Sequence, residues 1–218
     1  ASGEDLPRAR IFLERAVSRD PSRAKHHLYV GWVNLEMGDL SAAGRALNET
    51  IKLDSTLADA YWKRGELLVK QRAVRDALVD LDRALELAPS RTEAHAQKAL
   101  AYLELGQEQN AVAEFQIAVN APVVDPAWHY RLGDLLLANR RPAEAKQQLE
   151  LALEKVKTRS TEPPWVANAH RLLALAIGRK REALEHWQAY INAKKGSSDP
   201  YLTDAAREMD AILSSLGH

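Results

Sequence analysis

The chain has 218 residues, of which 46% are apolar and only 6% aromatic, a composition typical of a helical fold that forms one large domain or two small ones. Thirty Lys and Arg residues balance thirty Asp and Glu residues, so the net charge gives no reason to expect nucleic-acid binding. The sequence has no cysteine, which excludes disulfides, thiolate zinc sites and cysteine catalysis, and it has no apolar run approaching about eighteen residues, which excludes membrane insertion.

The first predicted helix covers about residues 6–18. Its pattern is that of the second helix of a helix pair whose first helix is missing, and we assign residues 5–21 to this half-repeat. Ile11, Phe12 and Leu13 cannot all be covered by the one helix that follows. We therefore expect this end to contact upstream sequence, a second copy of the chain or a partner.

Four helix pairs follow with a fixed period of 34 residues, predicted at 24–57, 58–91, 92–125 and 126–159. A small residue recurs once per period in the middle of the first helix, at Gly31, Gly65, Ala99 and Gly133. Glycine there costs about 1 kcal/mol of helix propensity. We interpret this column as a place where two helices approach closely, so that packing offsets the cost. Three further columns keep the same period: Ala43, Ala77, Ala111 and Ala145; Leu47, Leu81, Phe115 and Leu149; Thr50, Ala84, Ala118 and Ala152.

This pattern resembles the tetratricopeptide repeat (TPR), a helix–turn–helix unit of 34 residues. Two repeats carry the resemblance best, through Tyr61, Gly65, Ala77, Leu81, Ala84 and Pro89, and through Ala99, Tyr102, Gly106, Ala111, Phe115 and Ala118. The resemblance covers essentially the whole chain. It implies an all-α, right-handed superhelical solenoid of antiparallel helix pairs, and a role in recognising other proteins.

The turn inside each helix pair departs from the family pattern in alternate repeats. Gly38 and Gly106 fill the expected turn position, but Arg72 and Arg140 replace glycine in the other two repeats. We expect those two turns to be less sharply set.

The C-terminal part is less regular. Residues 157–164 break the period and predict a longer loop, after which residues 164–194 form a degenerate fifth repeat. A final amphipathic helix at 200–216, ended by Gly217, is predicted to cap the array. We treat residues 1–218 as a single TPR domain.

Catalytic and metal-binding patterns find little support. His27, His95 and His129 share one column of successive repeats, too far apart to hold one ion, so they are interpreted as spacers between helices. Glu182 and His186 are four residues apart, which is typical of a pair on a helix surface. Phosphate-binding glycine loops and Gly-x-Ser-x-Gly are absent from the sequence. We expect no enzyme activity, no metal and no cofactor.

In TPR proteins the first helix of each repeat lines the concave wall, so this wall is where the resemblance places a partner. Aromatic and arginine side chains dominate interface energetics. Eight residues of the wall are expected to contact a partner: Tyr29, Trp32, Trp62, Lys63, Glu66, Tyr130, Arg131 and Asp134. They lie off the repeating packing columns, so replacing Trp62 and Tyr130 with alanine is expected to leave folding nearly intact. The alternative is that these aromatics fill the floor of the groove or pack between adjacent repeats.

The expected function is that of a scaffold or adaptor that binds a peptide or helix of another protein in the concave groove. The clamp that chaperone adaptors use for a C-terminal carboxylate needs Lys and Asn where this chain has Leu28 and Trp32, so we expect an apolar segment with acidic groups near Lys63 and Arg131. Two alternatives stay open: the TPR region of a larger signalling, secretion or motility-complex protein, and a module that self-associates through its N-terminal half-repeat. No nucleic-acid or membrane partner is expected, and a cytoplasmic or periplasmic location is left open.

Overall fold

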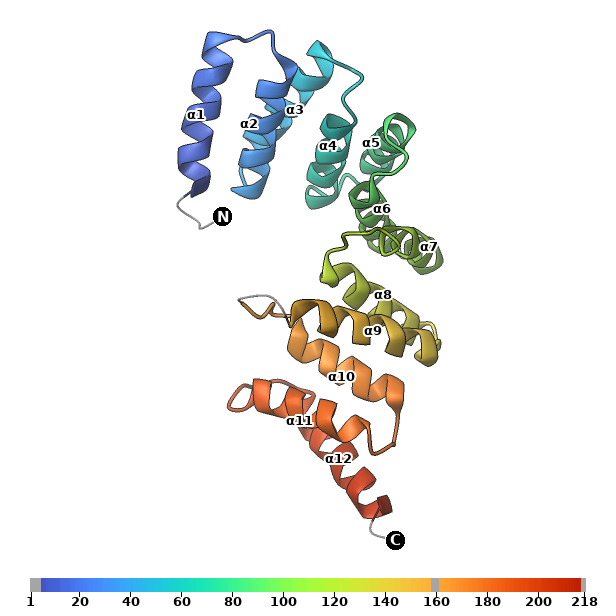
Figure 1. Ribbon diagram of the computed structural model, residues 1–218. Helices are drawn as coiled ribbons and strands as arrows, with labels where there is room; N and C mark the ends of the chain where they lie inside the picture. The colour runs from blue at the N-terminus through green and yellow to red at the C-terminus, as the bar shows by residue number, and fades with distance from the viewer. Residues whose placement is uncertain (1–4, 158–160, 217–218) are drawn as a thin grey trace. The chain divides into compact units, whose positions relative to one another are not determined.

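The computed structural model describes residues 5–157 and 161–216. Over these residues the chain forms twelve α-helices and no strand (Figure 1). The chain divides into two compact units, one ending at Ala118 and the other beginning at Val119. In the described part of the chain, none of the helices has the length and apolarity needed to cross a bilayer. That all the repeats fold as one domain remains a prediction.

The first unit begins with helix α1 (Asp5–Arg19), which packs against α2. Three antiparallel helix pairs then follow one another along the chain: α2 (Ala24–Glu36) with α3 (Leu40–Leu53), α4 (Ala58–Lys70) with α5 (Val74–Leu87), and α6 (Thr92–Glu104) with α7 (Glu108–Ala118). First helices of neighbouring repeats also touch, since α4 contacts both α2 and α6. The order of the helix pairs is as the sequence predicts, and the assignment of α1 as a half-repeat stays a prediction.

The second unit has two helix pairs and a terminal helix. The pairs are α8 (Pro126–Ala138) with α9 (Pro142–Val156), and α10 (Val166–Ile177) with α11 (Ala183–Lys194). Asp125 starts α8, because its carboxylate accepts a hydrogen bond from the Ala127 amide and proline follows at the first helical position. Helix α12 (Leu202–Leu216) packs on α11. The proposed helix end at Gly217 and part of the loop at 157–164 lie outside the described residues.

The small column of the first helices is a point of close approach, as predicted. A Cβ atom placed on Gly65 would lie 2.6 Å from Leu81 Cγ of the paired helix, and one on Gly31 would lie 2.7 Å from Leu47 Cγ. Gly133 has the same relation to Leu149, at 2.6 Å. Atoms cannot approach so closely without one of them moving. The missing side chain therefore lets a buried leucine seat directly on the facing helix backbone.

The turns inside the first four helix pairs share a positive φ at the same position. Gly38 and Gly106 have φ values of 80° and 69°, and Arg72 and Arg140 have φ values of 61° and 58°. The expectation that the two arginine turns are less sharply set is therefore wrong, because all four positions lie in the left-handed region. The position of these residues in the fold, rather than the residue type, sets the backbone conformation. A positive φ costs each arginine about 1–2 kcal/mol.

Replacing Arg140 with glycine is expected to stabilise the second unit by about 1 kcal/mol, since glycine adopts positive φ without steric cost. Urea unfolding followed by helical circular dichroism measures the change. The control is Arg207→Gly in the interior of α12, which should lose about 1 kcal/mol. A lower unfolding midpoint for Arg140→Gly would contradict the assigned turn conformation.

Candidate protein-interaction surface

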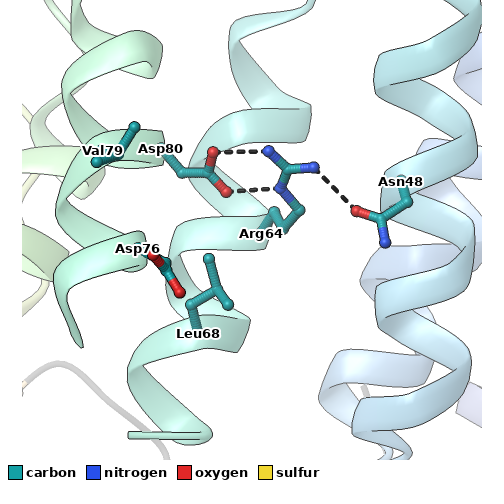
Figure 2. Close-up of a pocket in the computed structure, with 6 residues that line it drawn as sticks. All are labelled: Asn48, Arg64, Leu68, Asp76, Val79 and Asp80. Carbon is teal, nitrogen blue, oxygen red and sulfur yellow. Dashed lines mark hydrogen bonds and ion pairs between the residues drawn. The ribbon is translucent and has the colours of Figure 1, made fainter. Parts of the chain in front are cut away.

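A pocket of about 370 Å³ lies between helices α3, α4 and α5, and Figure 2 shows the six residues that line it: Asn48, Arg64, Leu68, Asp76, Val79 and Asp80. Arg64 crosses the pocket and donates two hydrogen bonds to Asp80, of 2.6 Å and 2.7 Å, and one of 2.9 Å to Asn48. These bonds tie three helices together. The guanidinium of Arg64 therefore already has hydrogen-bond partners within the chain. We interpret the pocket residues as holding the three helices together rather than as a ligand site.

Equivalent ties join the two helices of later repeats. His95 lies 2.7 Å from the Glu114 carboxylate, and His129 lies 2.8 Å from the Gln148 side-chain oxygen. These contacts confirm that both histidines act as partly or fully buried spacers between helices. Within residues 5–157 and 161–216, no three His, Asp or Glu side chains are grouped so that they could hold a metal ion.

In the degenerate repeat, two histidines form the contact between the paired helices α10 and α11. The Nδ1 atoms of His170 and His186 lie 3.0 Å apart, so one ring must donate to the other and at least one ring must be neutral. Burial lowers the pKa of both rings, and for His170 the charge of His186 lowers it further. Glu185 opposes this for both rings, and Glu150 for His186, while Lys157 beside His170 and Lys146 beside His186 add to the lowering.

We expect the second unit to lose stability in mild acid. The pKa of His129 is also lowered by burial, so three histidines bind protons more weakly in the folded state than in the unfolded chain. The stability that these neutral histidines contribute to the folded state is fully present above their pKa in the unfolded chain, which is about 6.5. It is lost as the pH falls below that value. Hydrogen exchange of α8–α11 at about pH 7 and pH 5 measures the loss. His170→Gln should reduce it, His26→Gln in the first unit should not, and equal protection at both pH values would contradict the prediction.

Aromatic and cationic side chains gather on the first helices of the first unit. The rings of Trp32 in α2 and Trp62 in α4 meet edge to face, with centroids 5.5 Å apart. Lys63 Nζ lies 4.2 Å from both ring centroids, and the Arg91 guanidinium lies 4.8 Å from that of Trp62. Both distances are in the range of cation–π attraction. We call Trp32, Trp62, Lys63, Glu66 and Arg91 the Trp–Lys cluster.

The charges of this cluster are neutralised within the chain. Lys63 is only 4% exposed and lies 2.8 Å from the Glu66 carboxylate and 3.8 Å from that of Glu36. Arg91 forms an ion pair with Asp59. The expectation that Lys63 attracts acidic groups of a partner is therefore wrong, since two carboxylates of the chain already face it.

Two of the expected contact residues are core residues. Trp62 is 7% exposed and Tyr130 is 8% exposed, so the expectation that neither is needed for packing is wrong. Each packs between neighbouring first helices, Trp62 against Trp32 and Tyr130 against α10, which is the alternative left open above. Lys63 and Glu66 are also buried.

The other expected residues are more accessible. Tyr29 is 47% exposed, Trp32 and Asp134 are partly exposed, and Arg131 is exposed. Burial raises the pKa of the Asp134 carboxyl, while the charges of Arg171 and Arg131 oppose the rise. The structure therefore divides the eight residues into a buried floor and an accessible set, and the role of either in binding stays a proposal.

The second unit has its own aromatic cluster, formed by residues of α8 and α10 and by residues just before α10 and α12, which the sequence pattern missed. Tyr130 stacks on Trp165 with ring centroids 5.0 Å apart, and its hydroxyl accepts a 2.7 Å hydrogen bond from Asn168. Arg171 donates to Asn168 over 2.8 Å and lies 4.3 Å from the ring centroid of Tyr201. We call Tyr130, Trp165, Asn168, Arg171 and Tyr201 the Tyr–Arg cluster. Of these residues, only Tyr130 falls in the regular 34-residue period. The one sign of the cluster in the sequence was the presence of aromatic residues, Trp165 and Tyr201, on either side of the degenerate repeat.

Comparison with known proteins agrees with this architecture. The family model described as tetratricopeptide repeat matches residues 62–123 and 97–163. An uncharacterized protein of Haemophilus influenzae is 35% identical over 77 residues, which are 35% of this chain and 43% of that protein. The match thus spans less than half of that relative's length.

Solved structures resemble the chain more completely. PilW, described as a widely conserved type IV pilus biogenesis factor, is 17% identical with a TM-score of 0.73, over 97% of this chain and 92% of PilW. YrrB, described as a TPR protein with an unusual peptide-binding site, is 19% identical with a TM-score of 0.65, over 84% of this chain and 93% of YrrB. The repeat columns, the paired helices and the family model that matches residues 62–163 together support the assignment of the chain to the tetratricopeptide repeat family, whose members in general are scaffolds for protein interaction.

Proposed function

We propose that the chain is a non-catalytic scaffold or adaptor that binds a peptide or helix of another protein on the first-helix face of its first unit. The observation that carries the proposal is the Trp–Lys cluster. A solvated helix face needs only charged side chains, yet this face concentrates tryptophan, tyrosine and arginine, the residues that dominate interface energetics. Trp62 and Lys63 form its buried floor, and Trp32, Tyr29 and Glu36 present accessible atoms beside it.

The rigidity of the floor supports binding. Trp32 is held by the ring of Trp62 and by Lys63, so it loses little conformational entropy when a partner covers it. YrrB, which shares the fold, is described as having a peptide-binding site, and a comparable use of this fold is part of the proposal.

Site-specific photocrosslinking in an extract of the source organism tests the proposal. A photoreactive phenylalanine replaces Tyr29 on α2 in one sample and Val79 on α5, which is 68% exposed, in the other. The proposal requires a discrete crosslinked protein from position 29 and none from position 79. Trp32→Ala should reduce the yield at position 29. Crosslinks from position 79 alone would move the binding face to the second helices.

Self-association through α1 is the second candidate, and one observation favours it. No residue of α1 is buried, and Phe12 and Ile11 are 66% and 48% exposed. If a second copy covers this face, the chain should dimerise at high concentration and Phe12→Asp should abolish the dimer. Sedimentation velocity over a wide concentration range measures this, and a monomer throughout would remove the candidate.

A place in a larger assembly is the third candidate. PilW, described as a pilus biogenesis factor, matches nearly the whole of both chains, which favours a secretion or motility complex over a signalling one. Deletion of the gene and measurement of surface pili and twitching motility test this role. Normal pili in the deletion strain would exclude it.

A further inference from the structure

The Tyr–Arg cluster contains a cation, Arg171, that forms no close ion pair within the described part of the chain, although its charge acts on Asp134. Arg171 bonds to Asn168 through Nε and lies over the Tyr201 ring, but in the described part of the chain no carboxylate lies within ion-pair distance of it. The cations of the Trp–Lys cluster differ, since Lys63 and Arg91 each face carboxylates of the chain. Arg171 is partly exposed, so its charge is accessible to a partner.

The surrounding residues fix the orientation of the guanidinium. Asn168 donates to the Tyr130 hydroxyl through its amide nitrogen and accepts from Arg171 Nε through its oxygen, so its side chain cannot turn freely. Tyr130 is held in turn by its stack on Trp165. The two terminal amino groups of Arg171 make no hydrogen bond to any described residue. The result is a preoriented fork of donors, of the kind that binds a carboxylate through two parallel hydrogen bonds.

We infer that Arg171, framed by Asn168 and Tyr201, is the subsite for the side-chain carboxylate of an Asp or Glu within a partner peptide, next to an apolar residue that contacts Tyr201. This inference goes beyond the proposed function, because Arg171 belongs to the second unit and the proposed binding face to the first. Tyr201 is 50% exposed, so its ring offers apolar surface beside the fork.

The balance of charge around the cluster favours an acidic partner. Arg131 is exposed, 6.0 Å from the Tyr130 ring centroid, and adds a second positive charge. Asp134 is the competing carboxylate of this face, partly buried and under the influence of both arginines. Asp199 does not compete, because it accepts a hydrogen bond from Tyr190 and pairs with Lys194. Removal of the Asp134 charge should therefore strengthen binding of an acidic peptide.

An array of short synthetic peptides tests the inference, with the intact chain as analyte. Each peptide carries one aromatic or leucine residue beside a variable position and is made in three forms: Glu with an amidated C-terminus, Gln with an amidated C-terminus, and Gln with a free C-terminus. Fluorescence anisotropy then gives the affinity of the selected peptides. The Glu form should bind about tenfold more tightly than either Gln form.

Variants assign the preference to the cluster. Arg171→Gln should abolish the tenfold preference, and Asp134→Asn should strengthen binding of the Glu form several-fold, a gain that misfolding cannot produce. Arg207→Gln is the matched control, since Arg207 is an exposed arginine already paired with Asp204, and it should keep the preference.

Three results would overturn the inference while leaving the proposed function standing: equal binding of the Glu and Gln forms, a Glu preference that survives in Arg171→Gln, or a preference for the free C-terminus over the side chain. Failure of every peptide to bind would also overturn the inference, whereas crosslinking from position 29 tests the proposed function separately.

Discussion

Replacing Gly133 with valine is expected to lower the free energy of unfolding of the second unit by about 3 kcal/mol, because it overfills a contact with no spare volume. The Cβ atom alone would lie 2.6 Å from Leu149 Cγ and 3.3 Å from the backbone oxygen of Ala145. Relief requires both a new leucine rotamer and a shift of α9. Gly65→Val should have a similar effect in the first unit, where Leu81 Cγ is 2.6 Å away. Urea unfolding followed by circular dichroism measures both changes.

Gly44→Ala is the matched control for this prediction. Gly44 also lies inside a helix, α3, but a Cβ atom there would lie 3.4 Å from Leu67 Cδ2, within ordinary contact range. The substitution should therefore gain roughly 0.5–1 kcal/mol from helix propensity. If Gly133→Val unfolded at the same urea concentration as the parent chain, the close approach would not be the reason for the glycine.

Trp62→Ala is expected to destabilise the first unit by about 3–5 kcal/mol. The side chain is 7% exposed and joins α2 to α4 through Trp32. Its loss would also remove one aromatic face from Lys63, whose buried charge would then have less favourable surroundings. Thermal and urea unfolding measure the effect.

Tyr29→Ala on the same face is the control for Trp62. Because Tyr29 is 47% exposed, its removal should change stability by no more than about 0.5 kcal/mol. Equal stability of the Trp62 and Tyr29 variants would place Trp62 outside the core. It would then return to the accessible set of partner contacts.

The fold could be predicted because its main constraints repeat within each 34-residue unit. The contact between Gly65 and Leu81 lies inside one repeat, and so does that between Gly133 and Leu149, so one period in the sequence describes both. The left-handed turns were harder to predict. Arg72 gives no local sign of positive φ, and only the equivalent position of Gly38 reveals it.

The candidate surface was harder to predict, because it is made between repeats. The burial of Trp62 depends on Trp32 in the preceding repeat, a contact that a count of positions within one helix pair does not include. Arg171 and Tyr201 come together only after the degenerate repeat and the loop before α12 are placed in space. Their side chains carry no periodic signal, so the repeat pattern did not identify them.

The packing of a leucine directly on a glycine, found inside three of the helix pairs, has an evolutionary consequence. Both residues of each such contact lie in the same repeat. A gene could therefore gain or lose a whole repeat without breaking the core of the repeats that remain. The Trp32–Trp62 contact differs, because its two residues lie in neighbouring repeats, so it would be lost if a repeat were inserted between them. A duplication or deletion would therefore preserve the fold while creating a new pair of neighbouring first helices. In this family of arrays, changes in repeat number offer a direct route to new partner specificity.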